Sequence, residues 1–239
     1  MVKPALFFNP NPSVSVVPLS GQRQCVVIDN VLSDPQAMVD WAAGQAFRAP
    51  DNPYPGLVLD APAAVTRHMS DYFAAYARSR LGGRRTQAAN LRFSMVTLPA
   101  AQLRPVQWQC HRDRFVVNPE RVLYSASVLY LFRDSRLGGT SFYEPKCPED
   151  ELNRMRDDSE TMGPAQFSER YGLQPGYMAG SNRYFERVGQ VSAAWNRMIF
   201  YDGSQFHSGE INEAAGMSAD PRVGRLTLNG FFICSRTIG

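Results

Sequence analysis

The chain has three histidines among its 239 residues, and one of them stands two positions before an acid. The stretch "QWQCHRDRF" (107–115) holds this pair, His111 and Asp113. On an extended segment the side chains of residues i and i+2 point to the same face, so both can reach one metal ion. Such a pair also occurs by chance as a simple hydrogen-bonded couple, so it indicates a metal site only if a third ligand exists.

His207 is the expected third ligand, and His68 is not. His68 lies beside an arginine on the expected wet face of a helix, which is typical of a surface histidine. His207 stands in "YDGSQFHSGEI", after an apolar strand, where a turn delivers side chains to the mouth of a sheet. Two histidines and one carboxylate that leave three coordination positions open are the donor set of non-haem Fe(II) oxygenases.

A basic residue opens the expected strand 225–235, "RLTLNGFFICS". An oxygenase that uses a 2-oxo acid needs a cation for the distal carboxylate of that acid, and arginine supplies two parallel hydrogen bonds. Strand alternation places Arg225 on one face with the residues at every second position after it: Thr227, Asn229 and Phe231. Arg222, in the preceding turn, is the alternative cation.

Two helices and then a series of short strands are expected to position these residues. The N-terminal part should contain, in order, a strand (23–32), a helix capped by Ser33 (33–47), a proline-rich loop (48–60) and a second helix (61–81). The expected later strands are 90–98, 122–132, 138–145, 194–203 and 225–235. This order predicts an antiparallel sandwich or barrel with helices packed on the outside.

The composition fits one globular domain with a substantial core, with 44% hydrophobic and 20% charged residues. The net charge is only +3 and the basic residues are spread out, so no nucleic-acid partner is expected. No stretch resembles a signal peptide or a membrane span, which favours a cytoplasmic protein with no membrane partner. The four cysteines are far apart and predict neither a zinc site nor a disulfide framework.

Taken in order, these motifs resemble the 2-oxoglutarate/Fe(II)-dependent dioxygenases, in particular the prolyl-hydroxylase-like branch with its HxD…H…R series. The opening "CVVIDNVLSDPQAMVDWA" is similar to the strand and helix before the core of that branch, and "GGTSFYEP" is similar to a glycine-led strand that lines its site. The resemblance implies an α+β, mainly β fold. Its core would be a double-stranded β-helix (a cupin-like jelly roll) with N-terminal helices packed on the outside.

The resemblance also implies roles for individual residues. The Fe(II) ligands would be His111, Asp113 and His207. Arg225 would bind the distal carboxylate of the cosubstrate 2-oxoglutarate, and Tyr130, in "LYLF", would supply a hydroxyl to the same carboxylate. Thr227, on the strand face of Arg225, is assigned to the same cosubstrate site.

The implied plan is one domain over residues 1–239, with the N-terminal strand and supporting helices at 23–87 and the jelly-roll core at 88–235. A polar, partly helical insert at 146–190 separates the two histidines and is a candidate lid. The implied reaction hydroxylates a C–H bond of a small molecule, amino acid or peptide and releases succinate and CO2. The aromatic residues expected near the mouth suit such substrates: Phe115, Phe142, Tyr143 and Trp195.

Two other functions fit the same residues. A cupin-type metal protein would use the two histidines and the acid without 2-oxoglutarate, and a role for Arg225 in cosubstrate binding would distinguish the two. A non-catalytic β-sandwich binding module would carry the same residues as scattered polar groups, and stoichiometric metal uptake would argue against it. The oligomeric state is left open, a homodimer included.

Overall fold

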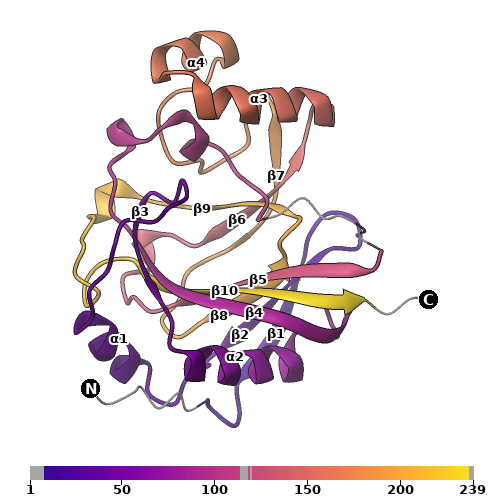
Figure 1. Cartoon of the computed structure of the whole chain (residues 1–239), viewed down its shortest axis with the longest axis vertical. Coiled ribbons are helices and arrows are strands. Elements are labelled where there is room, and N and C mark those ends of the chain that lie inside the picture. Colours follow the sequence, from indigo (N-terminus) through magenta and orange to yellow (C-terminus); the bar gives the residue numbers. More distant parts are fainter. Residues whose placement is uncertain (1–7, 114–117, 119, 237–239) are drawn as a thin grey trace.

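The computed structural model describes residues 8–113, 118 and 120–236, and two antiparallel sheets form its centre (Figure 1). The larger sheet has seven strands, in spatial order β1 (Ser13–Pro18), β2 (Gln24–Asp29), β8 (Met198–Asp202), β5 (Val122–Tyr130), β10 (Leu226–Arg236), β4 (Gly83–Val96) and β3 (Gly56–Asp60). The smaller sheet has three, in the order β7 (Phe185–Val191), β6 (Thr140–Pro145) and β9 (Phe206–Gly209).

From β4 onward the chain passes back and forth between the two sheets. β4, β5, β8 and β10 lie in the larger sheet, and β6, β7 and β9 lie in the smaller one. The segment between β4 and β5 also visits the smaller sheet, where His111 forms a single backbone bridge with His207 of β9. This alternation is the double-stranded β-helix, so the predicted α+β, mainly β jelly-roll fold is confirmed.

The helices are α1 (Pro35–Ala43), α2 (Ala63–Tyr76), α3 (Glu149–Thr161) and α4 (Pro164–Tyr171). α2 buries its apolar stripe against the larger sheet because Val65, Met69 and Phe73 recur at helical spacing. Phe73 stacks on Phe232 of β10 with 4.3 Å between the ring centres. α1 joins the same core, whereas α3 and α4 pack with a separate cluster next to the smaller sheet (Figure 1). The N-terminal helices thus lie outside the sheets, as predicted.

Side-chain alternation along β10 leaves space between the sheets. Leu226, Leu228 and Phe232 belong to the core that the helices cover. The residues between them face the smaller sheet and line a cavity. On β5 and β8 the corresponding inner positions are apolar, and Tyr130 and Ile199 pack there against Phe142 of β6. These apolar side chains therefore fill one end of the space between the two sheets, and the other end remains open.

Several element boundaries differ from the sequence prediction. The side chain of Asp34, and not of Ser33, caps α1 by accepting a 3.0 Å hydrogen bond from the amide of Ala37. The loop expected over 48–60 contains β3, whose short apolar run is preceded by prolines. β4 begins at Gly83, well before the expected strand 90–98, because Gly82, at φ +79°, turns the chain from the region of α2 directly into that strand.

Besides β3, the strands β1, β7 and β9 were not expected from the sequence. β1 alternates serine and valine at the sheet edge, and β7 carries Glu186, Arg187 and Gln190 on an edge of the smaller sheet. Such strands lack the apolar run that marks a buried strand. β7 also begins at Phe185, so the last residues of the 146–190 segment belong to the smaller sheet and the helical insertion ends before them. Among the described residues, no helix has the length and apolar character that a membrane crossing requires.

Candidate active site

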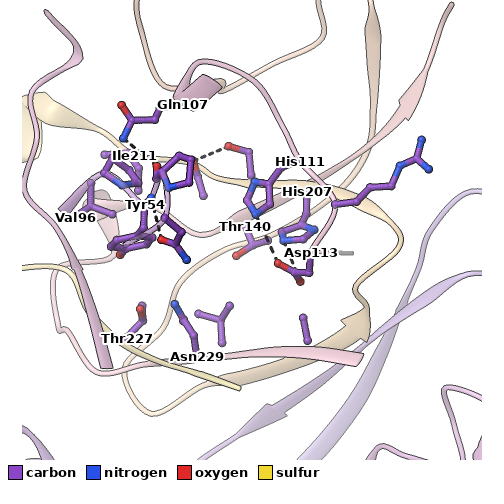
Figure 2. A pocket seen from close by; sticks show the side chains of 18 of the residues that line it. Tyr54, Val96, Gln107, His111, Asp113, Thr140, His207, Ile211, Thr227 and Asn229 are labelled. Atoms are coloured by element: carbon purple, nitrogen blue, oxygen red, sulfur yellow. Dashed lines mark hydrogen bonds and ion pairs between the residues drawn. The ribbon is translucent and has the colours of Figure 1, made fainter. Parts of the chain in front are cut away.

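Three side chains predicted to converge do so at the open end of the two sheets. One ligand atom each from His111, Asp113 and His207 can be chosen so that all lie within 4.8 Å of one another. Figure 2 shows the three side chains pointing toward one another. The backbone sets this arrangement: the two histidines exchange hydrogen bonds of 3.0 and 2.9 Å, and the Asp113 amide donates to the Gly203 carbonyl at 2.9 Å.

The imidazole of His207 is fixed by its neighbours. Its Nδ1 lies 2.9 Å from the carbonyl oxygen of Gln205, so Nδ1 carries the proton and donates to that oxygen. Its Nε2 then presents a lone pair, 3.6 Å from a carboxylate oxygen of Asp113. This arrangement, in which the second nitrogen of a histidine is held by a hydrogen bond, is usual for metal ligands.

The three ligands differ in solvent exposure. The side chains of His207 and Asp113 are 7% and 16% exposed, whereas that of His111 is 59% exposed. Nε2 of His111 lies 3.7 Å from Asp113, on the carboxylate oxygen that His207 does not face. A metal ion held here would have two buried donors and one donor at the protein surface.

The electrostatics of the buried pair suit a cation. Burial acts to raise the pKa of Asp113, but the imidazoles of His207 and His111 outweigh it and hold the pKa well below its usual value. Burial likewise disfavours protonated His207, but the Asp113 carboxylate raises its pKa. The Oδ2 atom of Asp113 is buried and has no hydrogen bond to any residue that the structure describes. An ionised carboxylate with an unused oxygen, beside two imidazoles, fits a divalent transition metal.

The neighbouring thiol of Cys110 is not a donor to this cluster. It is buried, and burial raises its pKa well above the usual value, so the sulfur stays protonated. Cys110 packs in the apolar cluster that includes Leu103 and Trp108, and the donor atoms that converge are those of the two imidazoles and the carboxylate.

The three ligands lie at one side of a cavity of about 560 Å³ that continues to Arg225. Its walls come from β4, β5, β9 and β10 and from the segments around Tyr54, Gln107 and Tyr177. The predicted row of alternating residues from Arg225 to Phe231 lines this cavity along its whole length. A cavity of this volume is within the usual range for small-molecule sites.

Arg225 is a buried cation without a carboxylate partner among the described residues. Its Nε donates to the carbonyl of Gly138 at 3.2 Å and its Nη2 to that of Gly139 at 3.1 Å, while Nη1 has no such partner. Burial lowers its pKa, against the nearby Tyr54, Tyr130 and other groups that favour the charge. A buried guanidinium is costly unless an anion pairs with it.

Arg222, the alternative cation, lies elsewhere. Its guanidinium is 54% exposed at the surface, 3.8 Å from carboxylates of Asp40 and Asp220. It does not line the cavity. Of the two arginines considered from the sequence, only Arg225 has access to the three metal-ligand candidates.

Tyr130 and Thr227 occupy neighbouring positions on β5 and β10, opposite each other in the register. Thr227 lines the cavity and donates to the carbonyl of Ser94 at 3.3 Å. Tyr130 is fully buried behind the cavity wall, and its hydroxyl lies 2.8 Å from that of Thr140, which does line the cavity. The Tyr130 hydroxyl therefore reaches the cavity through Thr140.

Two further tyrosines line the cavity: Tyr54, which was not foreseen from the sequence, and Tyr177, which belongs to the candidate lid segment 146–190. Tyr54, just before β3, directs its ring into the cavity (Figure 2), and its hydroxyl is buried with no hydrogen-bond partner in the described part of the chain. Burial raises the pKa of Tyr54 to about 12, although Arg225 and Arg92 favour its ionised form. Tyr177, after α4, lines the cavity and donates to the carbonyl of Leu98 at 2.6 Å. The sequence signal for Tyr54 was weak, because it stands in "NPYPG", which indicates only a turn.

The remaining sequence expectations fall outside the cavity. His68 is exposed on α2, as predicted. Phe142 and Tyr143 are fully buried in packing clusters, and Trp195 packs under Arg133 with 4.2 Å between guanidinium and ring centre. Phe115 lies outside the described residues. In the described part of the chain, the phenol and phenyl rings that line the cavity are those of Tyr54, Tyr177, Tyr201 and Phe231.

A family described as "Family of unknown function (DUF6445)" matches residues 10–232. The chain belongs to this family. The match covers both sheets, all three candidate metal ligands and Arg225 of this DUF6445 member. The curated proteins contain no match to it.

Solved structures resemble this DUF6445 chain at low identity. The non-haem α-ketoglutarate-dependent epimerase SnoN from nogalamycin biosynthesis is 13% identical, with a TM-score of 0.45 over 90% of this chain and 81% of SnoN. HygX from Streptomyces hygroscopicus, with nickel and 2-oxoglutarate bound, is 10% identical, with a TM-score of 0.45 over 88% and 82%. A prolyl-4-hydroxylase from Pseudomonas putida is 16% identical, with a TM-score of 0.37 over 84% and 83%. The fold assignment rests on the strand order of the chain itself.

Proposed function

We propose that the protein is a non-haem Fe(II) oxygenase that uses 2-oxoglutarate and O2 to hydroxylate a C–H bond of a small molecule, amino acid or peptide. The observation that carries this proposal is the placement of Arg225. A buried guanidinium without a carboxylate partner among the described residues shares one cavity with His111, Asp113 and His207. A metal-binding donor set and an unpaired cation together fit a ligand that has both a chelating group and a distal carboxylate.

The chain's own residues would divide the work between binding and positioning. His111, Asp113 and His207 would hold Fe(II) and leave its other positions free. The carbonyls of Gly138 and Gly139 hold the Arg225 guanidinium in one orientation, so it would receive the distal carboxylate without rearrangement.

Residues from other segments would complete the site. The bound iron and 2-oxoglutarate would supply the oxidation of the substrate, with succinate and CO2 as products. The unpaired hydroxyl of Tyr54 is available to the same carboxylate as Arg225. Tyr177, from the 146–190 segment, covers one side of the cavity, which supports a role of this segment in excluding water.

Anaerobic addition of Fe(II) and 2-oxoglutarate to the purified protein tests this proposal. The chelate of the two has a charge-transfer absorption band, which we expect in the wild type and not in His111→Ala or Asp113→Ala. A His68→Ala variant is the matched control, because that histidine is exposed on α2, and it should keep the band. Absence of the band in the wild type would overturn the proposal.

The same experiment separates the other two functions considered. A cupin-type metal protein would bind Fe(II) or Mn(II) stoichiometrically and would be indifferent to both 2-oxoglutarate and Arg225→Gln. A non-catalytic binding module would take up no stoichiometric metal. The buried, unpaired guanidinium of Arg225 favours the oxygenase over both, since neither alternative provides an anion for it.

A further inference from the structure

A second arginine that has no carboxylate partner among the described residues lines the same cavity as Arg225. Arg92 lies on β4 and pairs in register with Asn229 of β10. Asn229 is four positions along the chain from Arg225, and both arginines line the cavity. Residues four apart on a strand are separated by about 13 Å at the backbone. The cavity thus has two cationic positions, and the metal-ligand candidates stand on the facing wall, on β9 and the bridged segment at His111.

The surroundings of Arg92 leave its charge uncompensated among the described residues. Its Nε atom is buried without a hydrogen-bond partner. The carboxylate nearest in register is that of Asp60, opposite Arg92 on β3, but Asp60 pairs instead with Arg48 at 3.3 Å. The guanidinium carbon lies 5.6 Å from the ring centre of Tyr54 and 5.5 Å from that of Phe231, which hold the group in place.

The charges that line the cavity indicate an anion at Arg92. Among the described residues, the charged groups that line the cavity besides Asp113 are Arg92, Arg112 and Arg225. Arg112 is paired with Glu149 at 2.7 Å. A divalent metal bound to the Asp113 carboxylate would keep one excess positive charge, and Arg225 carries another. The two negative charges of 2-oxoglutarate would balance these two positive charges. The charge of Arg92 would then still be without a counter-ion.

Asn229 adds a second recognition element beside Arg92. Its Oδ1 atom is buried and receives no hydrogen bond from a described residue, and its side chain points into the cavity in Figure 2. A carboxylate bound to Arg92 would therefore have an unused acceptor next to it. A ligand that carries an N–H or O–H group adjacent to its carboxylate would satisfy both positions.

We propose that Arg92 and Asn229 bind the carboxylate and the adjacent hydrogen-bond donor of the substrate, which is an amino acid or a 2-hydroxy acid. This inference rests on the proposed oxygenase function and names the substrate class of that site. Arg225 serves the cosubstrate and Arg92 serves the substrate, so each cation pairs with a different carboxylate.

The test uses the protein loaded with Ni(II) and saturating 2-oxoglutarate, which occupies Arg225 before any other acid is added. Free L-amino acids and L-2-hydroxy acids are titrated one by one, each next to its carboxamide, and binding is followed by calorimetry and by the midpoint of thermal unfolding. We expect at least one acid to bind while its amide does not. Arg92→Gln should raise the half-saturating concentration of that acid about thirtyfold or more, as for loss of one partner of a buried charge pair.

Two further variants make the result specific. Arg92→Lys keeps the charge and should bind the acid better than Arg92→Gln, which separates recognition from misfolding. Arg84→Gln removes an exposed arginine from the same strand and should bind the acid like the wild type.

The possible outcomes separate this inference from the proposed function. If acids and amides bind equally well, the proposed role of Arg92 is overturned and the proposed oxygenase function is not. The same holds if no acid binds to a protein that holds Ni(II) and 2-oxoglutarate. Loss of 2-oxoglutarate binding in Arg92→Gln assigns Arg92 to the cosubstrate and also overturns it. A wild type that binds neither Ni(II) nor 2-oxoglutarate overturns the proposed function itself.

Discussion

The three histidines of the chain have the same chemistry and entirely different surroundings. His68 is exposed on α2, His111 is half in solvent at the cavity edge, and His207 is buried with one ring nitrogen held by a carbonyl. Of the three, His111 and His207 lie next to the Asp113 carboxylate, whose Oδ2 atom has no hydrogen bond among the described residues. At this scale, function depends on which polar atoms remain unsatisfied.

The first prediction at the residue scale concerns Arg225. Arg225→Gln should weaken 2-oxoglutarate binding about tenfold to a hundredfold, because a charged hydrogen-bonded pair contributes about 1.5–3 kcal/mol. Arg225→Lys should recover only part of the affinity, since lysine cannot make two parallel bonds. Calorimetric titration of the Mn(II)-loaded protein measures this, and Arg222→Gln, at the exposed position, should behave as the wild type. Equal affinities in Arg225→Gln and wild type would refute the assignment.

A second residue-scale prediction concerns Tyr54, whose buried hydroxyl has no hydrogen-bond partner among the described residues. Tyr54→Phe should leave the free energy of unfolding of the metal-free protein unchanged or higher by about 1 kcal/mol, because an unsatisfied buried group is removed. The same change should weaken 2-oxoglutarate binding several-fold. Urea unfolding and calorimetric titration give the two values. A large loss of stability without an effect on binding would assign Tyr54 to packing.

At the scale of elements, the turn into β6 supports the cosubstrate site. Gly138 has φ +96°, and a Cβ there would lie 1.4 Å from the carbonyl oxygen of Glu210. A Cβ on Gly139 would lie 2.1 Å from the carbonyl oxygen of Val191. Both glycines direct their own carbonyls to Arg225. The two glycines are therefore needed for close backbone approach, and that approach places the cation.

The element-scale prediction follows from this crowding. Gly139→Ala should lower the free energy of unfolding by about 2 kcal/mol or more and should also weaken 2-oxoglutarate binding, because the carbonyls that hold Arg225 must move. Gly163→Ala is the control, since a Cβ at Gly163 meets nothing within 4 Å. Thermal unfolding and the titration used for Arg225 report the two effects. If Gly139→Ala were as stable as Gly163→Ala, the backbone contact would not be a constraint.

Elements whose apolar residues recur at a regular spacing were predictable from the sequence. Elements that depend on pairing with another strand were not. The stripe of α2 and the alternation of β10 are visible because each repeats over several turns or residues. β3 is only five residues long and follows prolines, so its existence depends on pairing with β4. Tyr54 was not foreseen for the same reason. It stands two residues before Gly56, and the pairing of Gly56 with Val96 of β4 places it at the cavity.

For the whole molecule, the site joins strands that are far apart in the sequence. His111 and His207 stand on neighbouring positions of the smaller sheet, and Arg225 lies at the start of β10 in the larger one. The order HxD, histidine, arginine could be found in the sequence because it follows the strand order of the fold. The convergence of Arg92 with Asn229 could not, since it depends on the register between β4 and β10.

Metal binding should therefore stabilise the whole fold. Mn(II) at a hundred times its dissociation constant should raise the free energy of unfolding by about 2.7 kcal/mol, because the ligands converge only in the folded chain. A chelator should reverse the shift, and Asp113→Ala should abolish it. His68→Ala should show the full shift in thermal unfolding. A shift that persists in Asp113→Ala would place the metal elsewhere.

The unequal exposure of the metal ligands bears on how quickly a metal ion would exchange. Donor atoms leave a metal one at a time, and a competing chelator or ion can displace first only a donor that it can reach. Here that donor is the imidazole of His111, while His207 and Asp113 remain shielded. Residence time would then depend on the bridged segment at His111, and tightness on the buried pair. A competing chelator would therefore reach the metal first at the imidazole of His111.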